Sequence, residues 1–88
     1  MHDVYILKSS KLNRYYVGST SNIEARIKWH NAGRVKYTSR GLPWVLMRFI
    51  VCDSLTVARQ SEYRLKKYKR RDILEKVIAD GKFPWNYS

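Results

Sequence analysis

The chain has 88 residues, with 18 lysines and arginines against 7 aspartates and glutamates, and a formal net charge of +11. This length predicts one domain over residues 1–88 and excludes a multidomain enzyme. Apolar residues make up 44% of the chain, enough for a small core, which excludes a disordered basic tail.

Two short runs of β-prone residues open the chain. Residues 4–7 and 14–18 are predicted as strands, and the polar turn between them, residues 9–13, predicts an antiparallel hairpin. Ser21 and Glu24 then form a capping-box pattern, which predicts a helix over residues 22–31 that stops at Gly33. The segment after this helix is predicted as a basic loop.

The longest β-prone run, residues 44–52, is predicted as the third and central strand. A helix is predicted over residues 56–69, and a new cap at Asp72 predicts a short helix that ends at Gly81. Residues 82–88 form an aromatic tail. The pattern therefore predicts an α/β (α+β) fold in which helices pack on a small, mostly antiparallel sheet.

The charge balance points to the partner. A polyanion relieves the self-repulsion of a strongly basic domain and releases counterions, so nucleic acid is the leading partner. An anionic membrane surface is the alternative, but it would call for a strongly amphipathic basic helix or a lipid signal, and no lipidation motif is present. No stretch has the roughly 18–20 apolar residues of a membrane span either, so we expect no membrane partner. The one cysteine, Cys52, predicts no disulfide-linked partner and fits a reducing, cytoplasmic location.

Two charged residues interrupt apolar helix faces. Arg26 and His30 lie at the edge of the stripe that Ile23 and Ile27 define. Arg26 either points into a polar cleft that takes an anion or, as is commoner for an isolated arginine, reaches outward to a surface acid.

Glu62 falls between Ala58 and Leu65 on one face of the second long helix. A carboxylate there must be paired or must bind a cation. Two interpretations have equal weight: a salt bridge to Lys66 four residues later, or a ligand for a hard cation such as Mg²⁺, which takes one or two carboxylates and fills its other positions with water and phosphate.

Several of these residues belong to an ordered set of motifs. The set comprises Tyr5, Tyr16-Val17-Gly18, Arg26, His30-Asn31-Ala32-Gly33, Lys36-Tyr37-Thr38 and a helical Glu62. Over about residues 3 to 78 the chain resembles the standalone single-domain branch of the GIY-YIG nuclease superfamily and is similar to the N-terminal nuclease domain of the DNA-repair excinuclease UvrC. It departs from the family at Asp3, where glycine is usual, and at Ser19, where UvrC carries a lysine.

The resemblance implies a three-stranded antiparallel sheet flanked by helices and an endonuclease that hydrolyses DNA phosphodiesters with one divalent ion, Mg²⁺ or Mn²⁺. The positions that match the family's catalytic residues are Tyr5, Tyr16, Arg26, His30 and Glu62. Glu62 would hold the metal and Arg26 would bind the phosphate. One tyrosine would take a proton from water while the other orients it, and the basic tyrosine would need a pKa below its ordinary value of about 10, lowered by Arg26 and the metal. His30 either shares in proton transfer or holds Tyr16.

Seven exposed lysines and arginines are expected to bind the phosphates of DNA. These are Arg34, Lys36, Arg40, Lys66, Lys67, Lys69 and Arg70. Contacts of this type bind phosphates without reading bases, which predicts weak sequence specificity and steep salt dependence. Two other functions remain open: a non-catalytic nucleic-acid-binding module, and a nuclease subunit that needs a partner protein to supply specificity.

Overall fold

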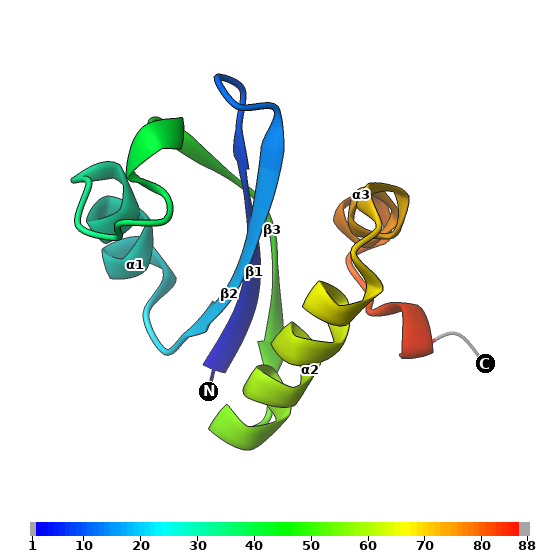
Figure 1. The fold of residues 1–88 in the computed structure, drawn as a ribbon. Helices are drawn as coiled ribbons and strands as arrows, with labels where there is room; N and C mark the ends of the chain where they lie inside the picture. The colour runs from blue at the N-terminus through cyan, green and yellow to red at the C-terminus, as the bar shows by residue number, and fades with distance from the viewer. Residues whose placement is uncertain (1, 87–88) are drawn as a thin grey trace.

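A computed structural model describes residues 2–86, so Tyr87 and Ser88, the end of the predicted aromatic tail, lie outside the described residues. The described elements, in chain order, are β1 (His2–Ser9), β2 (Arg14–Thr20), α1 (Ile23–Asn31), the 3₁₀ turn η1 (Ser39–Gly41), β3 (Trp44–Cys52), α2 (Leu55–Tyr68), α3 (Arg71–Asp80) and the 3₁₀ turn η2 (Pro84–Asn86). Figure 1 shows α1 on one face of the sheet and α2 with α3 on the other. Within this range no helix is long and apolar enough to cross a lipid bilayer.

The three strands form an antiparallel sheet in the order β2-β1-β3. The α+β fold is therefore confirmed, but the prediction that residues 44–52 form the central strand is wrong. The central strand is β1, which is buried on both faces, with Val4, Tyr5 and Leu7 at most 2% exposed. β3 is an edge strand, and Val45 and Val51 on it are 58% and 50% exposed. The prediction failed because an antiparallel strand can be apolar along its length and still leave one face open to solvent.

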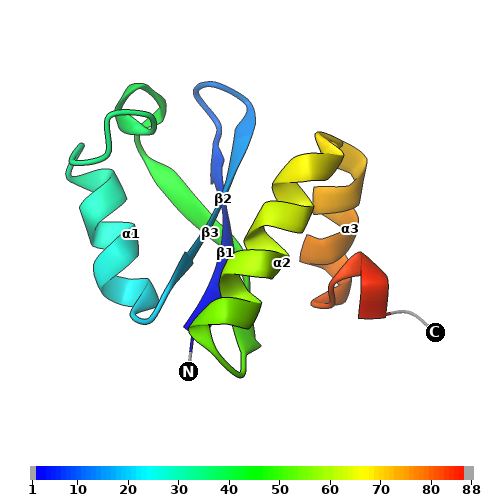
Figure 2. The same cartoon turned by 60° about the horizontal axis from the view of Figure 1, so that its bottom comes forward.

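Each face of the sheet has its own core, since successive side chains of a strand point to opposite faces. One core combines the sheet with α2, α3 and the C-terminal segment through Val4, Ile6, Val17, Cys52, Ala58, Leu65, Val77 and Phe83. The other core joins the sheet to α1 through Tyr5, Leu7 and Trp44, with Tyr16, Ile23, Ile27, Leu42 and Leu46 packed against them. The view in Figure 2, turned by 60°, shows the same separation of the helices by the sheet.

Two predicted helix N-caps are wrong, by one residue in α1 and by two residues in α3. The N-cap of α1 is Asn22, whose Oδ1 accepts the Ala25 N–H at 3.1 Å, rather than Ser21. The Thr20 side chain accepts the Asn22 N–H and sets this turn one residue later than the capping box implies. α3 begins at Arg71, so Asp72 lies inside its first turn instead of capping it.

Asn31 connects the end of α1 to the start of β3. Its side chain accepts the Trp44 N–H at 2.7 Å and donates to the Trp44 carbonyl at 3.0 Å. Gly33 follows with φ +75°, a left-handed conformation that suits glycine. This clamp closes the loop of residues 34–43 over α1, and the loop thereby carries Thr38 to His30.

Gly18 is required by the tyrosine that faces it. Tyr5 and Gly18 are directly paired across β1 and β2, and a Cβ at position 18 would lie 2.4 Å from the Tyr5 hydroxyl oxygen. No side chain approaches so closely, so the glycine leaves room for the Tyr5 ring to cross β2.

Gly18→Ala should lower the free energy of unfolding by about 2 kcal/mol, because the added methyl group forces the buried Tyr5 ring out of place. Urea unfolding followed by circular dichroism measures this loss. Val45→Ala, at an exposed strand position, is the control and should change stability far less. An unchanged midpoint for Gly18→Ala would contradict the close packing of Tyr5 on Gly18.

Candidate active site

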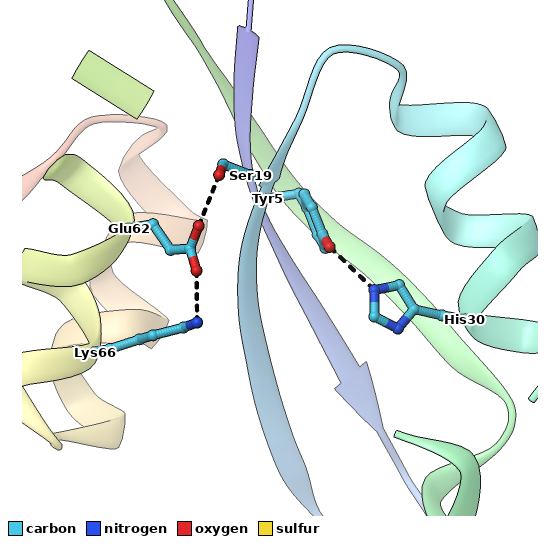
Figure 3. Close-up of polar contacts among 5 residues, drawn as sticks. All are labelled: Tyr5, Ser19, His30, Glu62 and Lys66. Carbon is cyan, nitrogen blue, oxygen red and sulfur yellow. Dashed lines mark hydrogen bonds and ion pairs between the residues drawn. The ribbon is translucent and has the colours of Figure 1, made fainter. Parts of the chain in front are cut away.

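Three buried side chains form a directional hydrogen-bond chain on the α1 face. The Thr38 hydroxyl donates to the Val35 carbonyl at 3.3 Å, so its oxygen accepts from Nδ1–H of His30 at 2.9 Å. Nε2 of His30 then lacks a proton and accepts from the Tyr5 hydroxyl at 3.0 Å (Figure 3). Tyr5, His30 and Thr38 are each at most 2% exposed. Because each group has one proton to donate, the chain selects the Nδ1–H tautomer of His30.

This burial keeps both ends of the Tyr5–His30 contact neutral. Burial, together with neighbouring Tyr16, raises the pKa of Tyr5 well above its ordinary value, and the opposing effect of Arg26 is smaller. Burial and then Arg26 lower the pKa of His30 below 6.5. The expectation that Arg26 brings down the pKa of the catalytic tyrosine is therefore not met at Tyr5, whose hydroxyl is suited to holding His30 rather than to accepting a proton.

Tyr16 lies on β2 beside this chain and is only partly buried. Its ring centroid is 6.3 Å from that of Tyr5 and 4.9 Å from that of His30, which it meets edge to face. The Nζ of Lys66 lies 5.6 Å from the centroid of the Tyr16 ring. His30 thus packs against Tyr16 but hydrogen-bonds to Tyr5. Of the two tyrosines, Tyr16 is the one that solvent can reach.

Glu62 approaches from the opposite face of the sheet. Its Oε1 accepts from the Ser19 hydroxyl at 2.7 Å, and its Oε2 lies 2.5 Å from Nζ of Lys66. Figure 3 shows Glu62 and Lys66 on one side of the strands, with Tyr5 and His30 on the other. The salt bridge to Lys66, one of the two interpretations of Glu62, is therefore formed. The Glu62 side chain nevertheless keeps 22% of its surface exposed, so the carboxylate is accessible.

A hollow of about 450 Å³ brings Arg26 and Glu62 together. We call it the Glu62 hollow, and it is lined by His2, Ser19, Thr20, Ser21, Arg26, Leu55, Arg59 and Glu62. It lies where β1 begins and β2 ends, so α1 and α2 both reach it from opposite faces of the sheet. The Arg26 guanidinium lies 4.4 Å from the centroid of the Trp29 ring, a contact with an aromatic ring in place of the predicted surface acid.

Arg59 is a lining residue that the sequence argument missed. It precedes Glu62 by three residues on α2, and side chains three apart on a helix are neighbours. This spacing from Glu62 is the feature of the sequence that could have identified Arg59. Arg59 adds a second guanidinium, beside that of Arg26, to the hollow.

The hollow fits a cation held by one carboxylate. Among residues 2–86 no group of three or more histidines, cysteines, aspartates or glutamates could hold a metal ion. Mg²⁺ commonly takes only one or two protein carboxylates and completes its shell with water and phosphate. Glu62, accessible at the side of a polar hollow, meets that minimal requirement, provided that a phosphate supplies further oxygens.

A larger groove of about 720 Å³, the basic groove, adjoins Tyr16 and Lys66. It is lined by Asn13, Arg14, Tyr15, Tyr16, Val17, Tyr37, Leu65, Lys66, Lys69, Arg70, Arg71 and Leu74. Three of the predicted phosphate contacts, Lys66, Lys69 and Arg70, thus line it. The other four, Arg34, Lys36, Arg40 and Lys67, are exposed but lie outside its lining.

Some cations of the groove also bind protein groups. Arg70 makes two hydrogen bonds to the Asp72 carboxylate, and Arg71 donates to both the backbone and the side chain of Asn13. Arg14 and Tyr37 line the groove although the sequence argument gave them no binding role, and Tyr37 is 73% exposed. The groove is therefore basic at its rim and aromatic on part of its wall.

Most of the chain is similar to a known protein family and to known proteins. The family model described as the GIY-YIG catalytic domain matches residues 1–76. Similar relatives include a UPF0213 protein of Staphylococcus haemolyticus, 42% identical over 77 residues that cover 86% of this chain and 93% of the relative. A UPF0213 protein of Clostridium perfringens is 38% identical over 88 residues, covering 99% of this chain and 94% of the relative. No solved structure gives a significant match.

The hydrogen-bond chain through His30 makes stability depend on pH. In the unfolded chain a histidine takes up a proton near its ordinary pKa of 6.5, whereas buried His30 has a lowered pKa. As the pH falls below 6.5, the unfolded state therefore binds more protons than the folded state does. The free energy of unfolding then falls until the pH is below the lowered pKa of His30. Urea unfolding at a series of pH values from about 7.5 to about 5.5 should show this fall.

The ring nitrogens of His30 provide the direct measurement. In ¹⁵N spectra we expect the Nδ1–H tautomer at neutral pH and a titration midpoint below 6.5. Thr38→Val removes the acceptor of Nδ1–H and should weaken the preference for that tautomer. The Nε2–H tautomer in the unsubstituted protein would show that the hydrogen bonds run in the opposite direction. A midpoint at or above 6.5 would contradict the lowered pKa of His30.

Proposed function

The chain belongs to the GIY-YIG catalytic domain family, a family of nucleases, and on that premise we propose that it is a metal-dependent DNA endonuclease with weak sequence specificity. The observation that carries the proposal is the shared hollow: α1 and α2, on opposite faces of the sheet, bring Arg26 and Glu62 to the same space. Tyr16 lines the adjoining groove, and Lys66, which pairs with Glu62, lies 5.6 Å from the centroid of its ring. A guanidinium, a carboxylate and an accessible phenol are the groups that phosphodiester hydrolysis needs.

Arg26 binds the scissile phosphate in this proposal. The planar guanidinium can donate two parallel hydrogen bonds to two phosphate oxygens, which no ammonium can do. Its contact with Trp29 limits the positions that it can take. Arg59, on the α2 side of the same hollow, provides further positive charge for the phosphate.

Tyr16 would act as its phenolate: its hydroxyl proton is first lost to solvent, and its oxygen then takes the proton of the attacking water. Support for this role comes from its access to solvent, because Tyr5 is 2% exposed and its pKa is raised. Tyr5 acts at a distance from the water: it holds Nε2 of His30, and the His30 ring packs edge to face on Tyr16 and limits its movement. Tyr5 and His30 are therefore positioning residues for Tyr16.

Glu62 is the residue that would hold the divalent cation, Mg²⁺ or Mn²⁺. When bound, such a cation stabilises negative charge on the phosphoryl and leaving oxygens. Ser19 fixes one carboxylate oxygen of Glu62 through its hydroxyl, which orients the side chain toward the hollow.

The basic groove positions the DNA strand next to this hollow. Lys69 and the other cations of its rim bind phosphates, and such contacts carry no sequence information. Specificity is therefore weak in the isolated protein, and a partner protein remains a candidate source of it. A cytoplasmic location suits the buried, unpaired thiol of Cys52.

A non-catalytic nucleic-acid-binding module is the rival function. Glu62 argues against it, because a carboxylate beside a phosphate repels the ligand unless a cation lies between them. The rival and the proposal differ in one outcome: both bind DNA, but only a nuclease cuts it.

Glu62→Gln should reduce nicking of supercoiled plasmid by about 100-fold or more, because loss of the cation removes several kcal/mol of transition-state stabilisation. Binding in a gel-shift assay should be retained, since one negative charge is removed from a phosphate site. Glu24→Gln, the same change at an exposed position of α1, is the matched control and should nick normally.

Chelation gives the complementary measurement for this variant. Nicking by the unsubstituted protein should stop with chelator and return with Mg²⁺ or Mn²⁺. If the protein binds DNA but never nicks it under either metal, the binding-module function is correct.

Tyr16→Phe should lower the nicking rate by about 100-fold or more, the contribution of a general base. Tyr5→Phe keeps the ring that covers Gly18 and loses only the hydrogen bond to His30, so its rate should fall by a smaller factor. Single-turnover nicking rates at saturating protein compare the two variants. Equal activity of Tyr16→Phe and the unsubstituted protein would exclude Tyr16 as the base.

A further inference from the structure

Lys66 stands at the boundary between the Glu62 hollow and the basic groove. It follows Glu62 by one helical turn, and its Nζ lies 2.5 Å from Oε2 of Glu62 and 5.6 Å from the centroid of the Tyr16 ring. Figure 3 shows the Lys66 side chain extended toward the carboxylate. Lys66 lines the groove while Glu62 lines the hollow, so this one ammonium touches both.

The ammonium occupies one of the two oxygens of the carboxylate that would hold a metal ion. Ser19 takes Oε1 and Lys66 takes Oε2, so each oxygen of Glu62 already has a protein partner. A metal ion must therefore share Oε2 with an ammonium or replace it.

The charges around the hollow oppose a free metal ion further. Arg26 and Arg59 line the hollow with Glu62, so with Lys66 three positive side chains surround one carboxylate. The two guanidinium groups and the ammonium repel a divalent ion that enters alone, and this repulsion opposes its attraction to Glu62. A DNA phosphate reverses this balance because it brings negative charge to the same space.

We propose that Lys66 competes with the catalytic metal for Glu62: its ammonium takes the place of the metal in the free protein, and metal and nucleic acid together displace it. This inference rests on the proposed function. Exposed pairs at i and i+4 are weak, and 48% of the Lys66 side chain is exposed, so the ammonium can leave. Its flexible four-carbon stem allows it to move toward a phosphate in the groove. Lys66 is thus a positioning residue for the metal site.

Mn²⁺ titration followed by NMR tests the proposal without any cleavage step. Bound Mn²⁺ broadens nearby amide signals, so the Ser19 and Glu62 amides report on the site. In Lys66→Met, half-broadening should require about tenfold less Mn²⁺, the effect expected on removing one charge about 5 Å from a divalent ion where water screens the two charges almost fully. Lys66→Arg keeps the charge and should behave like the unsubstituted protein.

Two controls separate this effect from a general change of charge. Lys67→Met removes the same charge from the next residue of α2 and should change the midpoint by less than about twofold, because charges outside the site are screened. In Lys66→Met combined with Glu62→Gln the gain should disappear, since the carboxylate is gone. An equal gain in Lys67→Met, or no gain in Lys66→Met, would overturn the proposal.

A short DNA hairpin with cleavage-resistant phosphorothioate linkages tests the second half. When this DNA is added to the unsubstituted protein, the Mn²⁺ concentration that half-broadens the Ser19 and Glu62 amides should fall. In Glu62→Gln the same DNA should lower the midpoint by less. If the DNA lowers the midpoint equally in both proteins, metal and nucleic acid do not displace Lys66 together.

If the protein nicks plasmid but Lys66→Met gains no Mn²⁺ binding, only this inference fails. If Lys66→Met gains binding but no metal supports nicking, the proposed function fails while the competition at Glu62 stands.

Discussion

The alternation of side chains along β2 is the constraint on which the site depends. Tyr16 and Gly18 are paired with Leu7 and Tyr5 and share their face of the sheet, so Ser19 points to the opposite face. The site is consequently built from both faces at once. The phenols belong to the α1 side of the sheet, and the carboxylate belongs to the α2 side.

This position at the sheet edge explains the distribution of charge. The interior on each face is apolar, and the polar hollow lies where α1 and α2 pass the end of the sheet. Charges there stay partly hydrated, which avoids the cost of burying them. The buried polar groups, His30 and Thr38, are instead neutral and hydrogen-bonded. The protein thus separates buried, hydrogen-bonded neutral groups, from Tyr5 to Thr38, from charged groups that line a solvent-accessible hollow.

Much of the fold followed from local pattern. Apolar runs and turn residues located the strands and helices within a few residues, and the ordered motifs identified the family, which the family model confirms. The place of β3 in the sheet could not be predicted, because strand order depends on which strand the helices cover, and no local run of residues reports this. The cap at Asn22 was missed because Ser21 and Asn22 are both good N-caps, and only the turn at Thr20 distinguishes them.

Less of the candidate site than of the fold could be predicted from the sequence. The family resemblance named Tyr5 and Tyr16 together, but it could not tell that one is buried and the other accessible, which depends on how the loop of residues 34–43 closes over α1. The direction of the His30 hydrogen bonds depends on Thr38, eight residues away. Arg59 shares the hollow with Arg26 because the end of β2 and the first turns of α1 and α2 meet there, which no local pattern of residues predicts.

The close contact of Tyr5 with Gly18 also limits how this protein can diverge. Any residue larger than glycine at position 18 collides with the Tyr5 ring, whereas a smaller residue at position 5 leaves an empty space above the glycine. Either change alone damages the sheet beneath the phenols, so accepted substitutions at these two positions must arrive as a compensating pair. Directed evolution of this scaffold should therefore randomise both codons together.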